Sequence, residues 1–152
     1  MSIEKDIKQT KFRDEWHKAS VNIIFASNWV LEQQKKHFDR GNLTAQQYNM
    51  LRILKGSTVP LSTLQIRERM LDKMSDTSRI VDRLVTKSLV EKKVNQFDKR
   101  LVDVIISQKG RELIDWMDNY AYEIDDVLKN LSADEATQLN ILLDKARLRK
   151  ED

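Results

Sequence analysis

The feature that most constrains this chain is a change of hydrophobic period between residues 44 and 106. Up to Leu89, apolar residues recur every three or four positions, which is the spacing of one helix face. From Val90 to Ile106 they occur in two alternating runs separated by the polar stretch NQFDKR at 95–100, which predicts a hairpin with a long turn. The sequence therefore predicts short helices followed by two strands.

Helix-start signals divide the first part of this segment. TAQQ at 44–47 and STLQ at 62–65 fit the capping box, in which a hydroxyl and an amide side chain satisfy free backbone N–H groups of the first turn. Ser75 is predicted to cap a third helix, in which Ile80, Val81 and Leu84 face inward.

Longer helical patterns flank the segment. Residues 12–38 carry apolar side chains on two faces, so a helix there must be covered from two sides, and Gly41 is predicted to end it. A stripe over 113–131 predicts a second long helix, and SADE at 132–135 opens a last one. With only three Gly and one Pro, the chain is predicted to be mainly α with a small β hairpin.

Three short helices followed by a hairpin is the element order of a winged helix-turn-helix, whose third helix enters the major groove of DNA. The third helix begins SDTSRIVDR, where hydroxyls and arginines suit base edges and phosphates. The predicted DNA contacts on this helix are Ser75, Asp76, Thr77, Ser78, Arg79 and Arg83. A solvated amphipathic helix is the alternative interpretation of the same pattern.

The charge distribution favours a polyanionic partner. The net charge is only +3, but residues 55–111 hold 13 basic and 7 acidic side chains, a net +6, and the remainder carries −3. Many soluble domains have such a bias without binding nucleic acid, so the charge alone does not decide the function.

Residues 60–110 resemble the MarR (multiple-antibiotic-resistance regulator) family of bacterial transcription factors. SRIVDRLVTKSLVEK at 78–92 looks like that family's recognition helix and first wing strand, and DKR at 98–100 followed by ISQKG looks like its wing signature. The resemblance implies that Arg100 enters the minor groove, that Asp98 orients it, and that Lys99 and Lys92 or Lys93 meet phosphates.

Three residues depart from the family pattern. Leu71 stands where the family often has a turn glycine, Arg67 where it often has a small residue, and Ser88 replaces the usual glycine before the wing. These departures bear on the tightness of the turns and on the DNA preference, and not on the fold.

The resemblance also implies a homodimer that binds a pseudo-palindromic operator in double-stranded DNA. In this interpretation residues 1–40 and 108–152 form a helical dimerisation region, and residues 41–107 form the DNA-binding lobe. The alternative is that the long helices form a bundle core within one chain.

Many members of the family bind small, often phenolic, anionic effectors between the dimerisation helices and the DNA-binding lobe. By position, Trp16, His17, Tyr48 and Arg52 are the candidates to line such a pocket. The alternative is that the two aromatic residues belong to the core and that the other two are solvated or paired.

The sequence gives little support to other classes of function. No cofactor is expected, and catalysis is not expected, because the chain has no Cys, no glycine-rich phosphate loop and no nucleophile-elbow pattern. His17 and His37 lie about 30 Å apart on one predicted helix, so no shared metal site is expected. A cytoplasmic location is expected, because no apolar run is long enough for a membrane span or a secretory signal.

The sequence therefore predicts a dimeric, sequence-specific DNA-binding transcriptional regulator, a repressor released by a small-molecule effector. The alternative is a protein-interaction module of winged-helix fold without specific DNA binding.

Overall fold

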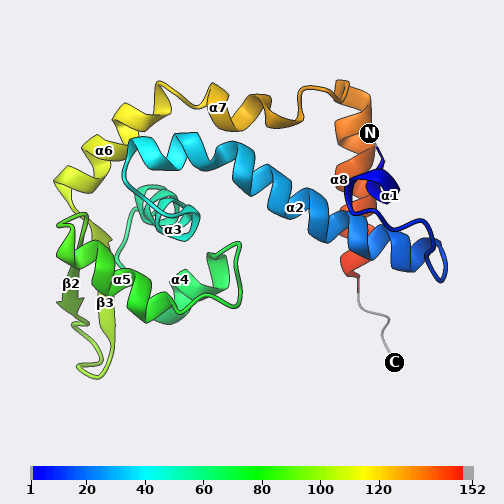
Figure 1. Ribbon diagram of the computed structural model, residues 1–152. Coiled ribbons are helices and arrows are strands. Elements are labelled where there is room, and N and C mark those ends of the chain that lie inside the picture. Colours follow the sequence, from blue (N-terminus) through cyan, green and yellow to red (C-terminus); the bar gives the residue numbers. More distant parts are fainter. Residues whose placement is uncertain (1, 149–152) are drawn as a thin grey trace.

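The computed structural model describes residues 2–148, which form a mainly helical molecule with one small sheet (Figure 1). The elements in chain order are α1 (Ile3–Asp6), α2 (Glu15–Arg40), α3 (Ala45–Lys55), β1 (Leu61–Ser62), α4 (Thr63–Arg69), α5 (Thr77–Thr86), β2 (Val90–Val94), β3 (Val102–Ile106), α6 (Gln108–Asp118), α7 (Tyr122–Asp125), the 3-10 helix η1 (Asp126–Leu128) and α8 (Ala133–Arg147). The predicted fold class, mainly α with a winged helix-turn-helix, is confirmed.

The helix starts follow the local capping chemistry closely. Complete capping boxes open α3 at Thr44, α4 at Ser62 and α8 at Ser132, as the sequence predicts. The expected cap of α5 is wrong by one residue. Asp76, and not Ser75, is the N-cap, and its carboxylate accepts a hydrogen bond from the Arg79 N–H at 3.1 Å.

The sheet contains the predicted hairpin and one additional short strand. β2 and β3 pair antiparallel, with Val90 opposite Ile106 and Val94 opposite Val102. The two-residue strand β1 pairs with the edge of β3 that faces away from β2, which gives the order β1–β3–β2. β1 was not predicted, because two residues are too few to show an alternating pattern.

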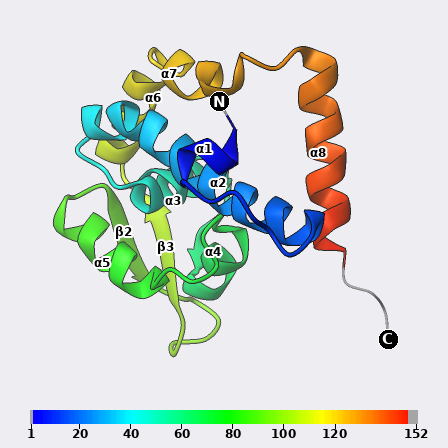
Figure 2. The same cartoon turned by 45° about the vertical axis from the view of Figure 1, so that its right-hand side comes forward.

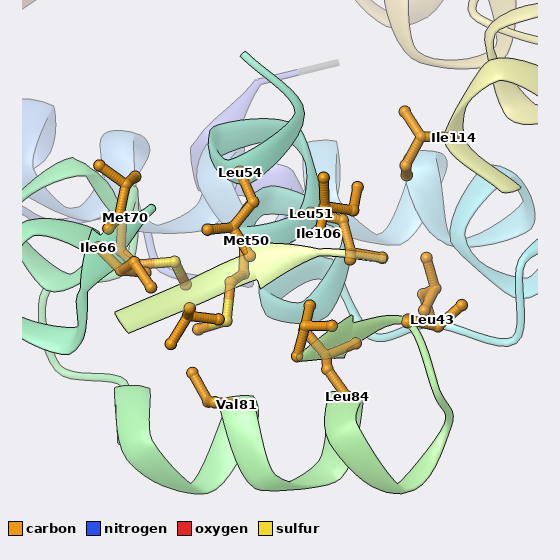
Figure 3. Close-up of a cluster of buried hydrophobic side chains, with 14 of the residues drawn as sticks. Leu43, Met50, Leu51, Leu54, Ile66, Met70, Val81, Leu84, Ile106 and Ile114 are labelled. Carbon is orange, nitrogen blue, oxygen red and sulfur yellow. The ribbon is translucent and has the colours of Figure 1, made fainter. Parts of the chain in front are cut away.

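One hydrophobic core holds the lobe together (Figure 3). Met50 and Leu51 of α3, Ile66 of α4 and Val81 and Leu84 of α5 are fully buried in it. Figure 3 shows these side chains converging around β3 from helices on both sides. This packing fixes α5 on the surface of the lobe, with its opposite face exposed.

The core does not follow the expected lobe boundary at residue 107. Ile114 and Met117 of α6 are fully buried in the same cluster as Leu43 and Leu51. Gly110 brings α6 close to the wing, since a Cβ there would lie 2.3 Å from the Leu89 carbonyl oxygen. The first helix after the wing is therefore packed as part of the lobe.

The long helix predicted over 113–131 is broken. α6 ends at Asp118, and α7 and η1 follow as separate short pieces. At the break the Tyr120 carbonyl accepts a hydrogen bond from the Glu123 N–H at 3.0 Å, which closes a tight turn over residues 120–123. The same carbonyl lies 3.1 Å from Nδ1 of the buried His37 on α2, so a tertiary contact holds the turn.

Two helices extend away from the lobe. α2 runs as one long rod from the lobe to the opposite end of the molecule, and α8 stands apart at that end (Figures 1 and 2). α8 contains no buried residue, and in α2 only His37 and Phe38, near its C-terminus, are buried. Among the residues described, no helix is both long and apolar enough to cross a membrane.

Candidate nucleic-acid interface

The outer face of α5 carries two exposed arginines. Val81 and Leu84 hold the helix to the core, which leaves Ser78, Arg79 and Arg83 exposed on the other side. Within residues 2–148, neither Arg79 nor Arg83 forms an ion pair. Both guanidinium groups are therefore available to an anionic partner.

Thr77, predicted to contact DNA, faces the core and not the solvent. Its side chain is only 6% exposed, and its buried hydroxyl has no hydrogen-bond partner among the described residues. Thr77 precedes Val81 by four residues and Leu84 by seven, which places all three on one helix face. That spacing is visible in the sequence and was the signal for its burial.

The side chains of the two residues before Thr77 form hydrogen bonds with the nearby backbone. Ser75 is half-buried, and its hydroxyl donates to the Asp72 carbonyl at 2.8 Å. Asp76 is exposed, but its carboxylate caps the helix. These two side chains shape the start of α5.

Lys92, expected to meet a phosphate, is ion-paired in this structure. Its ammonium contacts the carboxylate of Asp82, and both side chains are exposed. The pair ties the outer face of α5 to β2. Lys93, its exposed neighbour, is not in an ion pair among the described residues.

The tip of the wing, residues 95–101, is built around Asn95, which sequence reasoning missed. Its side-chain oxygen accepts hydrogen bonds from the N–H groups of Phe97 at 2.8 Å and Asp98 at 2.9 Å. Its amide nitrogen donates to both carboxylate oxygens of Asp103 on β3, at 3.0 and 3.1 Å. Asparagine at the start of a turn commonly bonds the backbone in this way, so the residue type was a usable signal.

Asp98 and Arg100 are connected within this tip. The Asp98 carboxylate accepts a hydrogen bond from the Arg100 N–H at 2.9 Å and lies 3.9 Å from its Nε. The Arg100 side chain is 95% exposed. Lys99 and Phe97 are exposed beside it, and Figure 1 shows the tip projecting beyond α5.

The four residues expected to line an effector pocket are not brought together within this chain. Trp16, 81% exposed, and His17 lie at the start of α2. The Tyr48 ring packs against His37, 5.2 Å between ring centres, near the other end of the same helix. The 20 residues between His17 and His37 correspond to about 30 Å of helix, so one pocket cannot contain all four.

Tyr48 and Arg52, one turn apart on α3, do lie close to α6. The Arg52 guanidinium donates to Asp118 at 2.6 Å, and Lys55 donates to the same carboxylate at 2.8 Å. Burial raises the pKa of the Tyr48 phenol. This leaves an exposed, charge-paired surface where α3 meets α6.

A polar cluster joins α2 to α7. Nε and Nη2 of Arg40 donate to the two carboxylate oxygens of Glu123, each at 2.8 Å, and the Lys36 ammonium lies 3.2 Å from the same carboxylate. The Arg40 guanidinium also stacks over the Tyr120 ring, 4.1 Å from its centre. Hydrogen bonding to Arg40 holds the pKa of Glu123 at about 2, far below its ordinary value of 4.5.

Comparisons with known proteins bear on this arrangement. No protein-family model matches the chain, and no curated protein matches it in sequence. Among solved structures, a mutant of E. coli MarR in complex with operator DNA superposes with a TM-score of 0.81 and 22% identity, covering 91% of this chain and 100% of that chain.

Two further structures have the same architecture. Bordetella bronchiseptica BpsR, described with the regulation of its DNA binding by 6-hydroxynicotinic acid, gives a TM-score of 0.79 at 18% identity, covering 93% of this chain and 100% of that one. The S. aureus MepR–DNA complex gives 0.72 at 18% identity, covering 84% and 94%. The likeness extends over most of the chain and therefore includes both the lobe and the helices outside it.

Proposed function

We propose that this chain, which has the winged-helix fold of the MarR regulators, is a homodimeric transcription factor that binds a pseudo-palindromic DNA site. In this proposal it is a repressor, not an enzyme, and a small molecule releases it from DNA. The observation that carries the proposal is the set of exposed cations on one lobe: Arg79 and Arg83 on α5, and Arg100 at the wing tip.

These three arginines suit the two grooves of DNA. A guanidinium on a helix in the major groove can donate two hydrogen bonds to a guanine edge or contact a phosphate. A guanidinium on a projecting wing can enter a narrow minor groove, where the negative potential is strongest. Ser78 and Lys99 are exposed near these arginines in the chain and would supply further contacts to the phosphate backbone of the DNA.

The proposed dimer rests on apolar surface that one chain leaves in water. Exposed apolar side chains occur on α2 from Trp16 to Leu31 and recur on α8: Trp16, Ile24, Phe25, Trp29, Leu31, Leu139, Ile141 and Leu142. Many large apolar side chains exposed on two helices favour an interface in a soluble protein. A second copy presents the same two helices and can cover both by two-fold symmetry.

The proposed effector acts where α3 meets α6. BpsR supports this part, because its DNA binding is described as regulated by 6-hydroxynicotinic acid. In this chain Arg52 is paired with Asp118 on the protein surface, and a small anion beside Tyr48 would compete for that guanidinium. 6-Hydroxynicotinic acid is the probe. Adding it should lower the DNA affinity of the wild type and leave the DNA affinity of Arg52→Ala unchanged.

The decisive experiment measures sequence preference. Fluorescence anisotropy across a salt series should compare the DNA upstream of the chain's own gene with random duplex. A clear preference supports the regulator. Equal affinity for both at every salt concentration would instead support a protein-interaction module of the same fold.

Arg100→Ala tests the wing within this proposal. The substitution should weaken specific binding by roughly 1–3 kcal/mol if the guanidinium reads the groove. It should also lower the salt dependence, because one fewer cation then meets the DNA. Unchanged affinity would show that the tip is only solvated.

A further inference from the structure

The wing tip exposes an aromatic ring that the contacts proposed above do not use. Phe97 is 98% exposed, more than any other large apolar side chain among the described residues. It lies two residues before Lys99 and three before Arg100, in the loop between β2 and β3, and Figure 1 shows this loop projecting away from the lobe.

Phe97 lies in an ordered, hydrogen-bonded turn. Its N–H donates to the Asn95 side chain at 2.8 Å, and the turn closes through the Leu101 N–H on the Asp98 carbonyl at 2.9 Å. The Asn95 N–H donates in turn to the Leu101 carbonyl at 3.0 Å. A fixed backbone at Phe97 removes part of the entropy cost of docking its ring on a partner.

We propose that Phe97 enters the minor groove of DNA beside Arg100 and packs its ring on the deoxyribose walls and an adjacent base step. This inference rests on the DNA-binding function proposed above. An exposed apolar ring within three residues of two exposed cations matches a groove with apolar deoxyribose walls and phosphates along its edges. Minor-groove proteins use such wedges, flanked by basic residues, to open a base step.

The proposal gives Phe97 and Arg100 separate tasks. Arg100 responds to the electrostatic potential of a narrow groove, and so to its width. Phe97 responds to how easily a base step opens, which is easiest at pyrimidine–purine steps. The wing would then select DNA by shape at one position and by deformability at a neighbouring one.

The test compares Phe97→Ala and Phe97→Leu with the wild type. The probe is the set of duplexes that the wild-type protein selects from a random-sequence library, with affinity measured by anisotropy over a salt series. Phe97→Ala should bind about tenfold or more weakly, because the burial of an aromatic ring is lost. The dependence of affinity on salt should stay unchanged, because no cation is removed.

Phe97→Leu and Arg100→Ala are the matched comparisons. Leucine keeps an apolar side chain and should retain most of the affinity, whereas Arg100→Ala should lower the salt dependence. Circular dichroism checks that Phe97→Ala keeps its fold, as expected for a side chain that is almost fully exposed.

The outcomes separate this inference from the function on which it rests. If the wild type selects no sequence from the library, the proposed function fails, whatever Phe97 does. If the wild type selects a sequence and Phe97→Ala binds it equally well, only the role of Phe97 is overturned. A lower salt dependence for Phe97→Ala would also overturn it, because the cations of the tip would then have moved.

Discussion

In α5, Val81 and Leu84 are completely buried, whereas on α8 Leu139 and Leu142 remain 37% and 62% exposed. Both helices have an apolar stripe at helical spacing. The stripe of α5 meets a core supplied by its own chain, and the stripe of α8 meets none. The same sequence pattern therefore supports the fold of the lobe in one place, and in the other leaves apolar surface exposed, which the proposed dimer would cover.

The largest expected effect is on the buried side of this comparison. Leu84→Ala should lower the free energy of unfolding by roughly 2–5 kcal/mol, because it leaves a cavity in a closely packed core. Urea unfolding at fixed protein concentration measures the change. Leu71→Ala is the control, because Leu71 is 85% exposed in the same lobe, and its effect should stay within about 0.5 kcal/mol. Equal losses for the two variants would mean that the core is not where the structure has it.

The next largest effect is expected on the proposed dimer, at the exposed apolar stripe of α8. Leu142→Glu should raise the dissociation constant of the proposed dimer on the order of a hundredfold, since it sets a charge in an apolar interface. Light scattering after gel filtration measures the mass. Asn140→Glu adds the same charge on the opposite side of α8 and should leave the dimer intact. A wild-type protein that is already monomeric at high concentration would break the comparison.

A smaller effect on stability is expected at the polar cluster that joins α2 to α7. Glu123→Gln removes the carboxylate that Arg40 and Lys36 contact, and should lower the stability at neutral pH. The pKa of Glu123 is lowered from 4.5 to about 2 in the folded chain, so its carboxylate contributes stability above about pH 4.5. That contribution is lost as the pH falls toward 2.

The difference between wild type and Glu123→Gln should therefore shrink over that pH window. Urea unfolding at a series of pH values measures it, with the exposed Asp126→Asn as the control. A difference that stays constant from neutral pH down to pH 2 would contradict the role of the ion pair.

The smallest effect is expected at Ser88. This residue has a φ of 61°, in the left-handed region that glycine tolerates best. Ser88→Gly should raise the free energy of unfolding by about 0.5–1 kcal/mol, because the strain removed exceeds the added freedom of the unfolded chain. The midpoint of urea unfolding measures it, and a lower midpoint would show that the serine is not strained.

The sequence predicted the parts of the fold that local chemistry determines. The caps at Thr44, Ser62 and Ser132 were predicted correctly because each needs only residues within one turn. The sequence also showed that Ser88 replaces the glycine usual in the family. The structure has a left-handed backbone there, which a glycine would favour.

Contacts between distant residues account for what could not be predicted. The break after Asp118 depends on the contact between His37 and the Tyr120 carbonyl, 83 residues apart in the chain. The pairing of Lys92 with Asp82 likewise appears only once α5 and β2 lie side by side. For Thr77 the spacing to Val81 and Leu84 was already sufficient to predict its burial.

The unbroken length of α2 has a mechanical consequence. Its 26 residues make a rod of about 39 Å, with its C-terminal end fixed in the polar cluster of Arg40 and Glu123. If α2 pivots about its N-terminal end, a tilt of about 5° moves its C-terminal end, and the lobe attached there, by about 3 Å. This is close to the rise of one base pair, about 3.4 Å. In the proposed dimer, a small rotation between the α2 helices of the two chains would therefore change the distance between the two lobes by about one base-pair step.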